Sequence, residues 1–212
     1  IFALDRSGIV GEDGKTHQGI FDLSYLTLMP NMIVSAPKDE NELQHLLYTA
    51  VQAQHPMAIR YPRGAGVGVP LEQELKALPV GKGELLKDGH DIVLLAIGAT
   101  VQPSLAAAQE LAKQNISAAV VNARFAKPLD SALILELASR IGRIITIEEN
   151  TLCGGFGSAV LGLLESSGLV NVKVRRLGIP DEFVEHGHPS LLRAKYKLDA
   201  PGIAQQVIAL FP

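Results

Sequence analysis

The chain begins with a polar, glycine-rich segment whose side chains could do chemistry. Residues 6–19 hold four glycines, two acids, two bases and a histidine, and they directly follow an apolar stretch at residues 1–4. Too few apolar side chains lie between Val10 and Ile20 to bury this stretch, and glycine loses more backbone freedom on folding than any other residue. We therefore interpret residues 6–19 as a candidate functional loop rather than as part of the core.

His17 and Asp13 are the candidate catalytic side chains of this loop. An imidazole titrates near neutral pH, can accept or donate a proton, and can hydrogen-bond a carboxylate. Two alternatives remain open: a loop histidine bonded to backbone carbonyls, and an aspartate that forms an Asx turn before Gly14. One histidine with two neighbouring acids is not a metal-ligand set, so no metal site is expected here.

Arg6 and Arg63 are candidate anion-binding residues. Each follows the end of an expected strand, and the carboxyl ends of parallel strands meet at the sheet edge where ligands bind. Two guanidinium groups that converge at this edge would suit a phosphate or a carboxylate. The alternative for each is a surface arginine paired with a nearby acid. Arg60 lies within its strand and is expected to make a structural pair.

A second polar motif, Glu-Glu-Asn at residues 148–150, ends another expected strand, and the glycine-rich residues 154–157 open a helix. Free N–H groups at a helix start can receive an anion, but the glycine order is not that of the dinucleotide fingerprint. We favour glycines that allow tight helix packing and a subunit contact. His186 and His188 lack a matching Cys or His cluster, so a surface loop is favoured over a metal site.

Strand-like and helix-like segments alternate along the chain, which is typical of an α/β fold with a mostly parallel sheet. Residues 64–83 break this pattern with five glycines and two prolines, and we interpret them as a linker. The helix that follows Asp39 is expected to be capped by this residue. Its core face is expected to comprise Leu43, Leu46, Leu47, Ala50 and Val51. Strands are expected at 1–4, 32–36, 58–61, 84–86, 92–97, 116–121, 144–147 and 172–177, and helices from Phe21, from Asp39 and at 101–113, 131–140, 157–167, 190–196 and 203–211.

Composition limits the possible partners. The net charge of −3 and the absence of a Lys or Arg run argue against a nucleic-acid partner. The longest apolar run, residues 92–97, is far shorter than the roughly 20 residues of a membrane span, so no membrane partner is expected. The single Cys153 cannot close an internal disulfide, which fits a reducing compartment. The chain starts inside an expected strand without a methionine, so we expect it to be the tail of a longer protein.

A series of sequence blocks extends along the chain: Leu4–Gly11, Asp13–Gly14, Thr16–Gly19, Phe21–Leu26, Arg60–Gly64, Phe125–Asp130, Glu148–Asn150, Gly154–Ser158 and Gly178–Asp181. Together they closely resemble the 1-deoxy-D-xylulose-5-phosphate synthase family of thiamine-diphosphate-dependent, transketolase-like enzymes. The early blocks are specific to this synthase, whereas the Glu-Glu-Asn and glycine blocks resemble the wider group. Lys15 stands where related sequences tend to have Pro or Gln, which adds a cation beside the candidate site.

This resemblance implies an α/β fold: the end of a parallel-sheet pyrimidine-binding domain at residues 1–63, a linker at 64–82, and a transketolase C-terminal-like domain with a mostly parallel sheet at 83–212. It implies a transferase that condenses pyruvate with glyceraldehyde 3-phosphate with loss of carbon dioxide. This reaction is the first step of the non-mevalonate isoprenoid pathway and also supplies thiamine biosynthesis. The implied cofactors are thiamine diphosphate and Mg²⁺, the implied assembly is a homodimer, and the implied location is the bacterial cytoplasm or the plastid stroma.

The resemblance also implies roles for the residues named above. Arg6 and Arg63 would grip the acceptor phosphate. His17 would contact the pyruvate-derived intermediate and manage protons. Asp13 would bind the acceptor hydroxyl and orient the site.

The family's diphosphate and metal motif and its cofactor-activating glutamate lie in an N-terminal portion that these 212 residues do not contain. We therefore expect the cofactors to be bound mainly by that portion and assign no cofactor-binding residue in this chain. We expect the chain to work beside its own N-terminal fragment and to be inactive alone. Two alternatives remain: an oxo-acid dehydrogenase β-type subunit, against which the block from Arg6 to His17 argues, and a non-catalytic dimerisation module.

Overall fold

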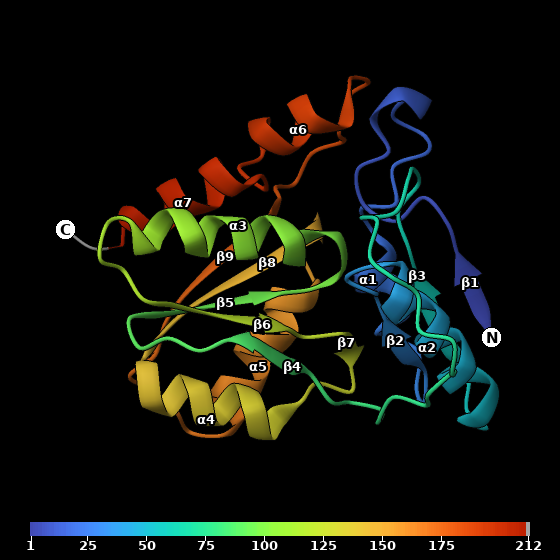
Figure 1. The fold of residues 1–212 in the computed structure, drawn as a ribbon, viewed down its shortest axis with the longest axis horizontal. Coiled ribbons are helices and arrows are strands. Elements are labelled where there is room, and N and C mark those ends of the chain that lie inside the picture. The colour runs from blue at the N-terminus through green and yellow to red at the C-terminus, as the bar shows by residue number, and fades with distance from the viewer. Residues whose placement is uncertain (211–212) are drawn as a thin grey trace.

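The computed structural model describes residues 1–210 and contains two β-sheets, each flanked by helices (Figure 1). The expected α/β class with mostly parallel strands is confirmed. The first sheet has the strand order β1-β3-β2-β7, and β7 is its antiparallel member. Its elements are β1 (Phe2–Leu4), β2 (Ile33–Ser35), β3 (Met57–Arg60) and β7 (Phe125–Lys127), with α1 (Asp22–Leu26), α2 (Glu40–Gln52) and the 3₁₀ turn η1 (Gly11–Asp13) in the connections.

The second sheet has the order β4-β6-β5-β8-β9, in which only β4 is antiparallel to its neighbour. Its strands are β4 (Glu84–Lys87), β5 (Ile92–Ala96), β6 (Ala118–Asn122), β8 (Arg143–Thr151) and β9 (Lys173–Ile179). Its helices are α3 (Val101–Ala112), α4 (Ser131–Ile141), α5 (Phe156–Ser166), α6 (Pro189–Lys195) and α7 (Ala200–Ile208), with the 3₁₀ turn η2 (Gly98–Thr100) before α3. The final helix was expected to reach Phe211, which lies outside the described residues.

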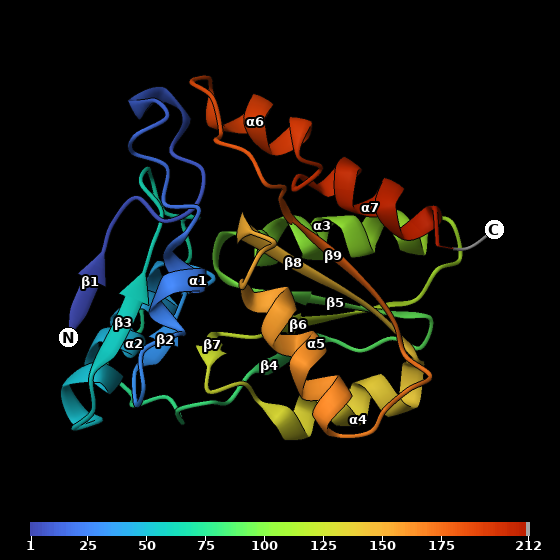
Figure 2. The same ribbon diagram turned by 180° about the vertical axis from the view of Figure 1, so that it is seen from behind.

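The central strand β5 shows why helices cover both faces of this sheet. All of its residues are buried, and successive side chains of a strand point to opposite faces. Ile92 and Leu94 pack into the core shared with α3 and α7, whereas Val93 and Leu95 pack into the core shared with α4 and α5. Figures 1 and 2 show these helix pairs on the two sides of the sheet.

Strand β7 was not expected from the sequence. It lies in the range assigned to the second domain, yet it pairs with β2 of the first sheet. Its Phe125 is fully buried in a cluster with Leu46 of α2 and Ile59 of β3. Burial of this aromatic ring joins a segment of the second half of the chain to the core of the first.

Helix α2 buries only part of the face expected: Leu46 and Ala50 are buried, and Leu43 packs against their cluster. Asp39 caps it as predicted, because its carboxylate accepts a hydrogen bond from the Glu42 N–H at 2.7 Å. Leu47 and Val51, however, are 39% and 67% exposed. The buried positions include the polar Glu42, His45 and Thr49.

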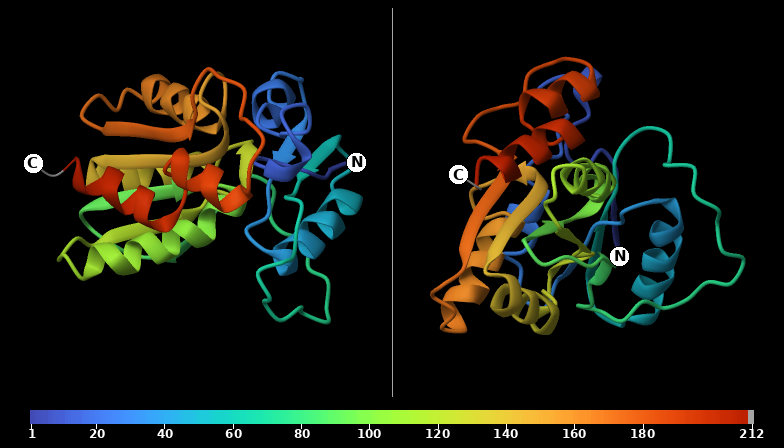
Figure 3. Two further views of the ribbon diagram at one scale, coloured as in Figure 1. Left: turned by 90° about the horizontal axis from the view of Figure 1, so that it is seen from above. Right: turned by 60° about the vertical axis from the view of Figure 1, so that its left-hand side comes forward.

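Two of these polar positions, His45 and Thr49, contact residues 64–82, which were expected as a linker and lie along α2. Glu42 is instead bonded to Asn122 and Arg124 of the second half of the chain. The Glu40 carboxylate accepts three backbone N–H groups, from residues 67, 68 and 69, at 2.6 to 3.0 Å. Further along the helix, His45 Nδ1 accepts the Lys76 N–H at 3.1 Å and Thr49 Oγ1 accepts the N–H of residue 78 at 2.8 Å. Figure 3 shows this segment as a long loop beside α2. Hydrogen bonds to helix side chains thus hold it in place without secondary structure of its own.

None of the helices in the described part of the chain has the length and hydropathy that a membrane crossing requires.

Candidate functional site

Three of the four candidate site residues meet beyond the carboxyl ends of β1 and β3. The two strands are parallel neighbours, so Arg6 and Arg63 leave the sheet at the same edge. The Asp13 carboxylate lies between them: Arg6 Nε donates to Oδ2 at 3.0 Å, and Arg63 Nη1 pairs with Oδ1. The expected convergence of the two arginines is therefore present, and an acid of the same loop bridges them.

The two arginines of this cluster are more exposed to solvent than the acid that bridges them. The Asp13 side chain is only 18% exposed, whereas Arg6 and Arg63 are 42% and 52% exposed. Arg6 also pairs with Asp5 through Nη1. Arg63 pairs with Asp13 through Nη1, and its side chain is half-exposed, so donors of the same guanidinium group remain accessible to an anionic ligand. Whether these groups bind a substrate phosphate stays a prediction.

The backbone at Arg6 is itself unusual. Its φ of 58° lies in the left-handed region, which costs a residue with a Cβ about 1–3 kcal/mol. The next residue, Ser7, donates its N–H to the Tyr61 carbonyl of the chain that follows β3, at 3.0 Å. The chain therefore turns sharply at Arg6 and is tied there to the segment that carries Arg63.

His17 lies apart from the three bridged residues. It is exposed, and its Nδ1 lies 3.1 Å from the Thr16 hydroxyl. Its backbone N–H donates to the Gly14 carbonyl at 3.1 Å. The structure thus places His17 in the same loop as Asp13 but gives it no contact with Arg6 or Arg63, so its catalytic role stays a prediction.

The loop that carries these residues is closed at its base. Gly8 and Gly19 exchange two backbone hydrogen bonds of 2.9 Å, which brings the two ends of the loop together. Within the loop, the buried Gln18 accepts the N–H groups of Val10 and Gly11 through Oε1, at 2.8 and 3.3 Å. These contacts satisfy backbone donors that the short, glycine-rich segment cannot pair in a helix or strand.

Arg60 makes the structural pair that was expected of it. This buried side chain donates through Nη2 to the carbonyl oxygens of Gly19 and Glu149 at 2.9 and 3.1 Å. Its Nε lies 3.5 Å from the Asp22 carboxylate, whose pKa is raised by burial and partly lowered again by this guanidinium. Arg60 therefore links the loop base, α1 and β8.

The Glu-Glu-Asn motif of β8 forms the other side of this junction. Glu148 is fully buried, and its carboxylate accepts the N–H groups of Phe156 and Gly157 at 2.7 and 2.8 Å. It therefore occupies the N-terminus of α5, where free donors and the helix dipole favour an anion. Burial nevertheless raises the Glu148 pKa from 4.5 to about 7, against the opposing effect of these two N–H groups.

The neighbouring members of the motif contact the first half of the chain. Glu149 accepts the Ile9 N–H at 3.0 Å through Oε2 and pairs with Arg193 of α6 through Oε1. Asn150 accepts the Leu23 N–H at 3.0 Å, at the start of α1, and donates to the Ser24 hydroxyl at 2.9 Å. These two side chains fasten the candidate loop and the helix that follows it to the second sheet.

The glycines at residues 154–157 support the packing interpretation. A Cβ on Gly155 would lie 2.4 Å from Glu148 Oε2, and a Cβ on Gly157 would lie 2.5 Å from Thr146 Oγ1. The Glu148 carboxylate already occupies this helix start, which leaves no room for an added anion. His188 caps α6 by accepting the Ser190 N–H, and His186 lies exposed in the loop before it.

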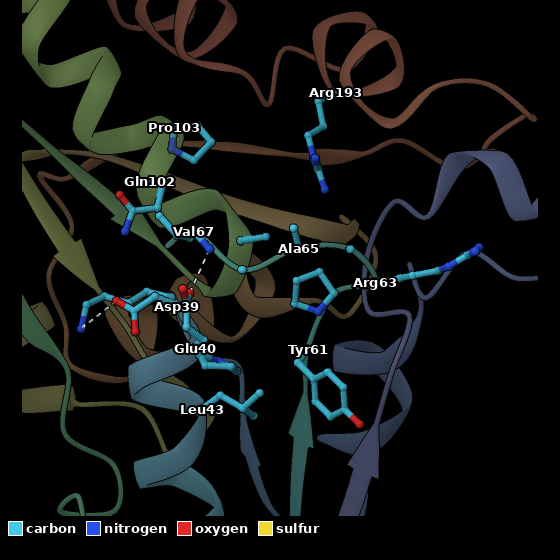
Figure 4. A pocket seen from close by; sticks show the side chains of 16 residues that line it. Asp39, Glu40, Leu43, Tyr61, Arg63, Ala65, Val67, Gln102, Pro103 and Arg193 are labelled. Carbon is cyan, nitrogen blue, oxygen red and sulfur yellow. Dashed lines mark hydrogen bonds and ion pairs between the residues drawn. The ribbon is translucent and has the colours of Figure 1, made fainter. Parts of the chain in front are cut away.

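A cavity of about 520 Å³ adjoins the cluster. Its wall includes Tyr61 and Arg63 from the first unit, Gln102 and Pro103 at the start of α3, and Arg193 of α6. Figure 4 shows Arg193 reaching into the cavity from α6, whereas the Arg63 side chain turns away toward the candidate loop. The cavity therefore lies between the two halves of the chain, with one arginine from each in its wall.

The described residues do not by themselves fit a bound Mg²⁺. Within residues 1–210, no group of three or more His, Cys, Asp or Glu side chains could hold a metal ion. Two of the acids in or beside the candidate loop are already engaged, Asp13 by two arginines and Glu149 by Arg193 and Ile9. Mg²⁺ that binds with a diphosphate usually takes one or two carboxylates in addition to phosphate oxygens and waters, and these two carboxylates already have other partners.

Glu149, Asn150 and Arg193 belong to this junction but were not assigned to the site from the sequence. Glu149 and Ile9 lie 140 residues apart in the chain, and no local pattern links positions at this distance. The only signal was the cluster of polar residues at the end of an otherwise apolar strand. Such a cluster indicates that the polar side chains are buried with hydrogen-bond partners, but it does not identify those partners.

Two transketolase family models match the chain. The transketolase pyrimidine-binding domain matches residues 1–67, and the transketolase C-terminal domain matches residues 81–203. Among solved structures, one described as an inactive β4 tetramer of a split-gene transketolase has a TM-score of 0.83 at 31% identity, covering 98% of this chain and 64% of that chain. A transketolase from Campylobacter jejuni shares the fold, with a TM-score of 0.71 at 24% identity, covering 98% of this chain and 31% of that one.

Curated relatives are more similar in sequence. The 1-deoxy-D-xylulose-5-phosphate synthase 1 of Geobacter metallireducens is 60% identical over 206 residues, which is 97% of this chain and 33% of the relative. The 1-deoxy-D-xylulose-5-phosphate synthase of Dehalococcoides mccartyi strain BAV1 is 54% identical over 211 residues, which is 99% of this chain and 33% of the relative. The chain thus spans about a third of the length of the curated relatives that it matches.

Proposed function

Because the chain belongs to the transketolase family, we propose that it is the C-terminal portion of a 1-deoxy-D-xylulose-5-phosphate synthase. The proposed reaction condenses pyruvate with glyceraldehyde 3-phosphate with loss of carbon dioxide. The relatives named above support this assignment by their names and by identities of 54% and 60% over nearly the whole chain. We further infer a role in isoprenoid and thiamine biosynthesis and a location in the bacterial cytoplasm or the plastid stroma.

One observation carries the proposal: Arg6 and Arg63 converge on Asp13 at the carboxyl edge of the first sheet. The half-exposed guanidinium group of Arg63 suits the phosphate of the acceptor, because a guanidinium fork matches phosphate oxygens. Asp13 holds both guanidinium groups in place and offers a carboxylate to the acceptor hydroxyl. His17, which is exposed in the same loop, is proposed to exchange a proton with a bound substrate.

The cofactor would be held mainly outside this chain. Thiamine diphosphate supplies the carbanion chemistry of transketolase-like enzymes, and the protein provides orientation and charge. We infer that the N-terminal portion binds the metal and the diphosphate, because the motif that holds them in this family lies in that portion. We therefore propose that the chain acts beside that portion, in a homodimer, and has no synthase activity alone.

The solved structure that is 31% identical supports this last point by analogy. It is described as an inactive β4 tetramer of a split-gene transketolase and covers 98% of this chain. A separately made chain of this kind can thus fold and assemble without being active. For the present chain, the same behaviour predicts a folded protein that gains activity only with its N-terminal portion.

The test compares three preparations whose intact masses have been verified: the chain alone, the N-terminal portion alone, and the two produced together. We expect deoxyxylulose phosphate only from the third, with added thiamine diphosphate and Mg²⁺. Synthase activity of the 212-residue chain alone would overturn the inactivity proposal. No activity from a folded complex of the two would overturn the assignment of the reaction.

A variant pair tests the acceptor site within that complex. Arg63→Met is expected to raise the KM for glyceraldehyde 3-phosphate about tenfold or more, the scale of one lost hydrogen bond to a charged group. The KM for unphosphorylated glyceraldehyde should stay within about twofold, because it lacks the phosphate that Arg63 would bind. Lys195→Met, on the exposed side of α6, is the control. Unchanged turnover after substitution of both His17 and Arg63 would favour a non-catalytic module.

A further inference from the structure

The Glu149 carboxylate lies where the candidate loop, β8 and α6 meet. Its side chain is 4% exposed, and each of its oxygens has a partner from a different segment. Oε2 accepts the Ile9 N–H at 3.0 Å, and Oε1 pairs with Nε of Arg193. A carboxylate held in this way joins the base of the loop to the C-terminal part of the chain.

Strand geometry explains why Glu149 and not Glu148 faces the loop. Successive side chains of a strand point to opposite faces of the sheet. Glu148 accordingly points to α5 and caps its first turn, while Glu149 points to the loop and to α6. The two adjacent acids therefore have separate structural roles.

The Glu149 carboxylate is the hydrogen-bond acceptor of the Ile9 N–H. Ile9 is 2% exposed, and a buried backbone N–H without an acceptor is costly. Its neighbour Gly8 lies so close that an added Cβ would be 2.3 Å from Glu149 Oε2. The chain thus packs tightly on this carboxylate immediately after Arg6 and shortly before Asp13.

Arg193 completes the arrangement. A buried carboxylate needs a cation or several donors to remain charged, and Arg193 is the cation that reaches it. The same guanidinium group lines the cavity whose wall also includes Arg63. The Glu149–Arg193 pair therefore connects the base of the loop with the wall of the cavity beside the arginine cluster.

Helix α6 also touches the loop directly. The Gly187 N–H, just before α6, donates to the Gly11 carbonyl at 3.4 Å, and Gln18 Nε2 donates to the Glu185 carbonyl at 3.4 Å. A Cβ on Gly11 would lie 2.3 Å from the Gly187 carbonyl oxygen. The segment before α6 thus also contacts the loop directly.

We propose that Glu149 is a positioning residue for the loop that carries Arg6, Asp13 and His17, and that Arg193 is the cation that holds it in place. Through this pair, the second domain sets the position of the acceptor-binding arginines and is more than a dimerisation surface. This proposal adds a positioning role to the candidate site, and it rests on the proposed function only for the identity of the substrate. The position of the loop can be measured without turnover.

The first test measures loop order in the 212-residue chain by hydrogen–deuterium exchange. Glu149→Gln is expected to speed exchange in peptides covering residues 6–19 about tenfold or more, because Arg193 is left without its anion and Ile9 with a weaker acceptor. Exchange in β5 should stay unchanged. Unchanged exchange at residues 6–19, or equal acceleration in β5, would overturn the proposal.

The second test uses the complete enzyme, with this chain and its N-terminal portion together. Glu149→Gln should raise the KM for glyceraldehyde 3-phosphate at least about fivefold while kcat falls less, because the loop is displaced but its groups are retained. The exposed ion pair between Glu185 and Lys195 provides the matched control, Glu185→Gln, which should stay within about twofold. A fall in kcat alone would contradict a positioning role.

Two variants of Arg193 distinguish an effect of its positive charge on the loop from a general loss of folding. Arg193→Lys keeps the charge and should restore most of the loop protection that Arg193→Met loses. If Glu149→Gln does not fold, the two Arg193 variants still test the proposal. Equal exchange at residues 6–19 in Arg193→Lys and Arg193→Met would refute it. If the complete enzyme makes no deoxyxylulose phosphate, the proposed function fails, while the exchange measurements still test the position of the loop.

Discussion

The fully buried Glu148 makes stability depend on pH in a direction unusual for a helix-capping acid. Burial raises its pKa in the folded chain to about 7 from the ordinary value of 4.5. The folded state therefore binds this proton more tightly than the unfolded state. Between these two pH values the folded chain keeps the proton and the unfolded chain releases it, so the free energy of unfolding falls as pH rises through this window.

The size of this effect follows from the two pKa values. A tenfold difference in proton affinity corresponds to about 1.4 kcal/mol, so raising the pKa from 4.5 to about 7 is worth about 3 kcal/mol. This contribution is fully present below pH 4.5 and is lost above about pH 7. Other groups also titrate across the range, so the wild-type curve alone does not isolate it.

Glu148→Gln isolates the contribution, because an amide does not titrate. The substitution leaves one acceptor for the two N–H groups of Phe156 and Gly157, at a roughly constant cost of about 1–3 kcal/mol. Urea unfolding of both proteins from pH 4 to pH 8 should show their stability difference changing by about 3 kcal/mol, with the variant gaining relative to the wild type as pH rises. The exposed Glu110→Gln is the control. Parallel curves for wild type and Glu148→Gln would refute the reasoning.

Two further predictions concern the backbone of the loop and the segment along α2. Gly8→Ala should destabilise the chain more than Gly14→Ala, because both glycines have positive φ angles of 71° and 86° but only Gly8 would place a Cβ against Glu149. Equal losses in urea midpoint would contradict this steric argument. Glu40→Ala should make residues 64–78 more sensitive to limited proteolysis with little change in Tm, because its carboxylate accepts three backbone N–H groups there. Unchanged cleavage would show that the remaining contacts suffice.

Much of the architecture could be predicted from local patterns. The apolar run that contains β5 predicts a buried strand because a parallel sheet covered on both faces buries every residue. Asp39 predicts a helix start because its side chain can satisfy a free N–H. Arg6 and Arg63 were expected to converge because the carboxyl ends of parallel strands share one edge.

The failures arose where a distant segment changed the surroundings of a residue. Leu47 and Val51 were expected in the core but are exposed, because residues 64–82 cover the polar side of α2 instead. Strand β7 is too short to show the alternating hydrophobic pattern of a strand. Its place beside β2 depends on burial of Phe125 in the core of the first sheet. Neither outcome can be read from a window of neighbouring residues.

The sequence by itself determined most of the segments that form strands and helices, and which chemical groups the glycine-rich loop carries, because hydrophobic periodicity and residue type act locally. Only the tertiary structure decided what those groups meet. It placed Asp13 between Arg6 and Arg63, and it brought Glu149 to the loop from 140 residues away. Such contacts form when the chain folds back and buries distant residues together, so they cannot be predicted from the spacing of residues along the sequence.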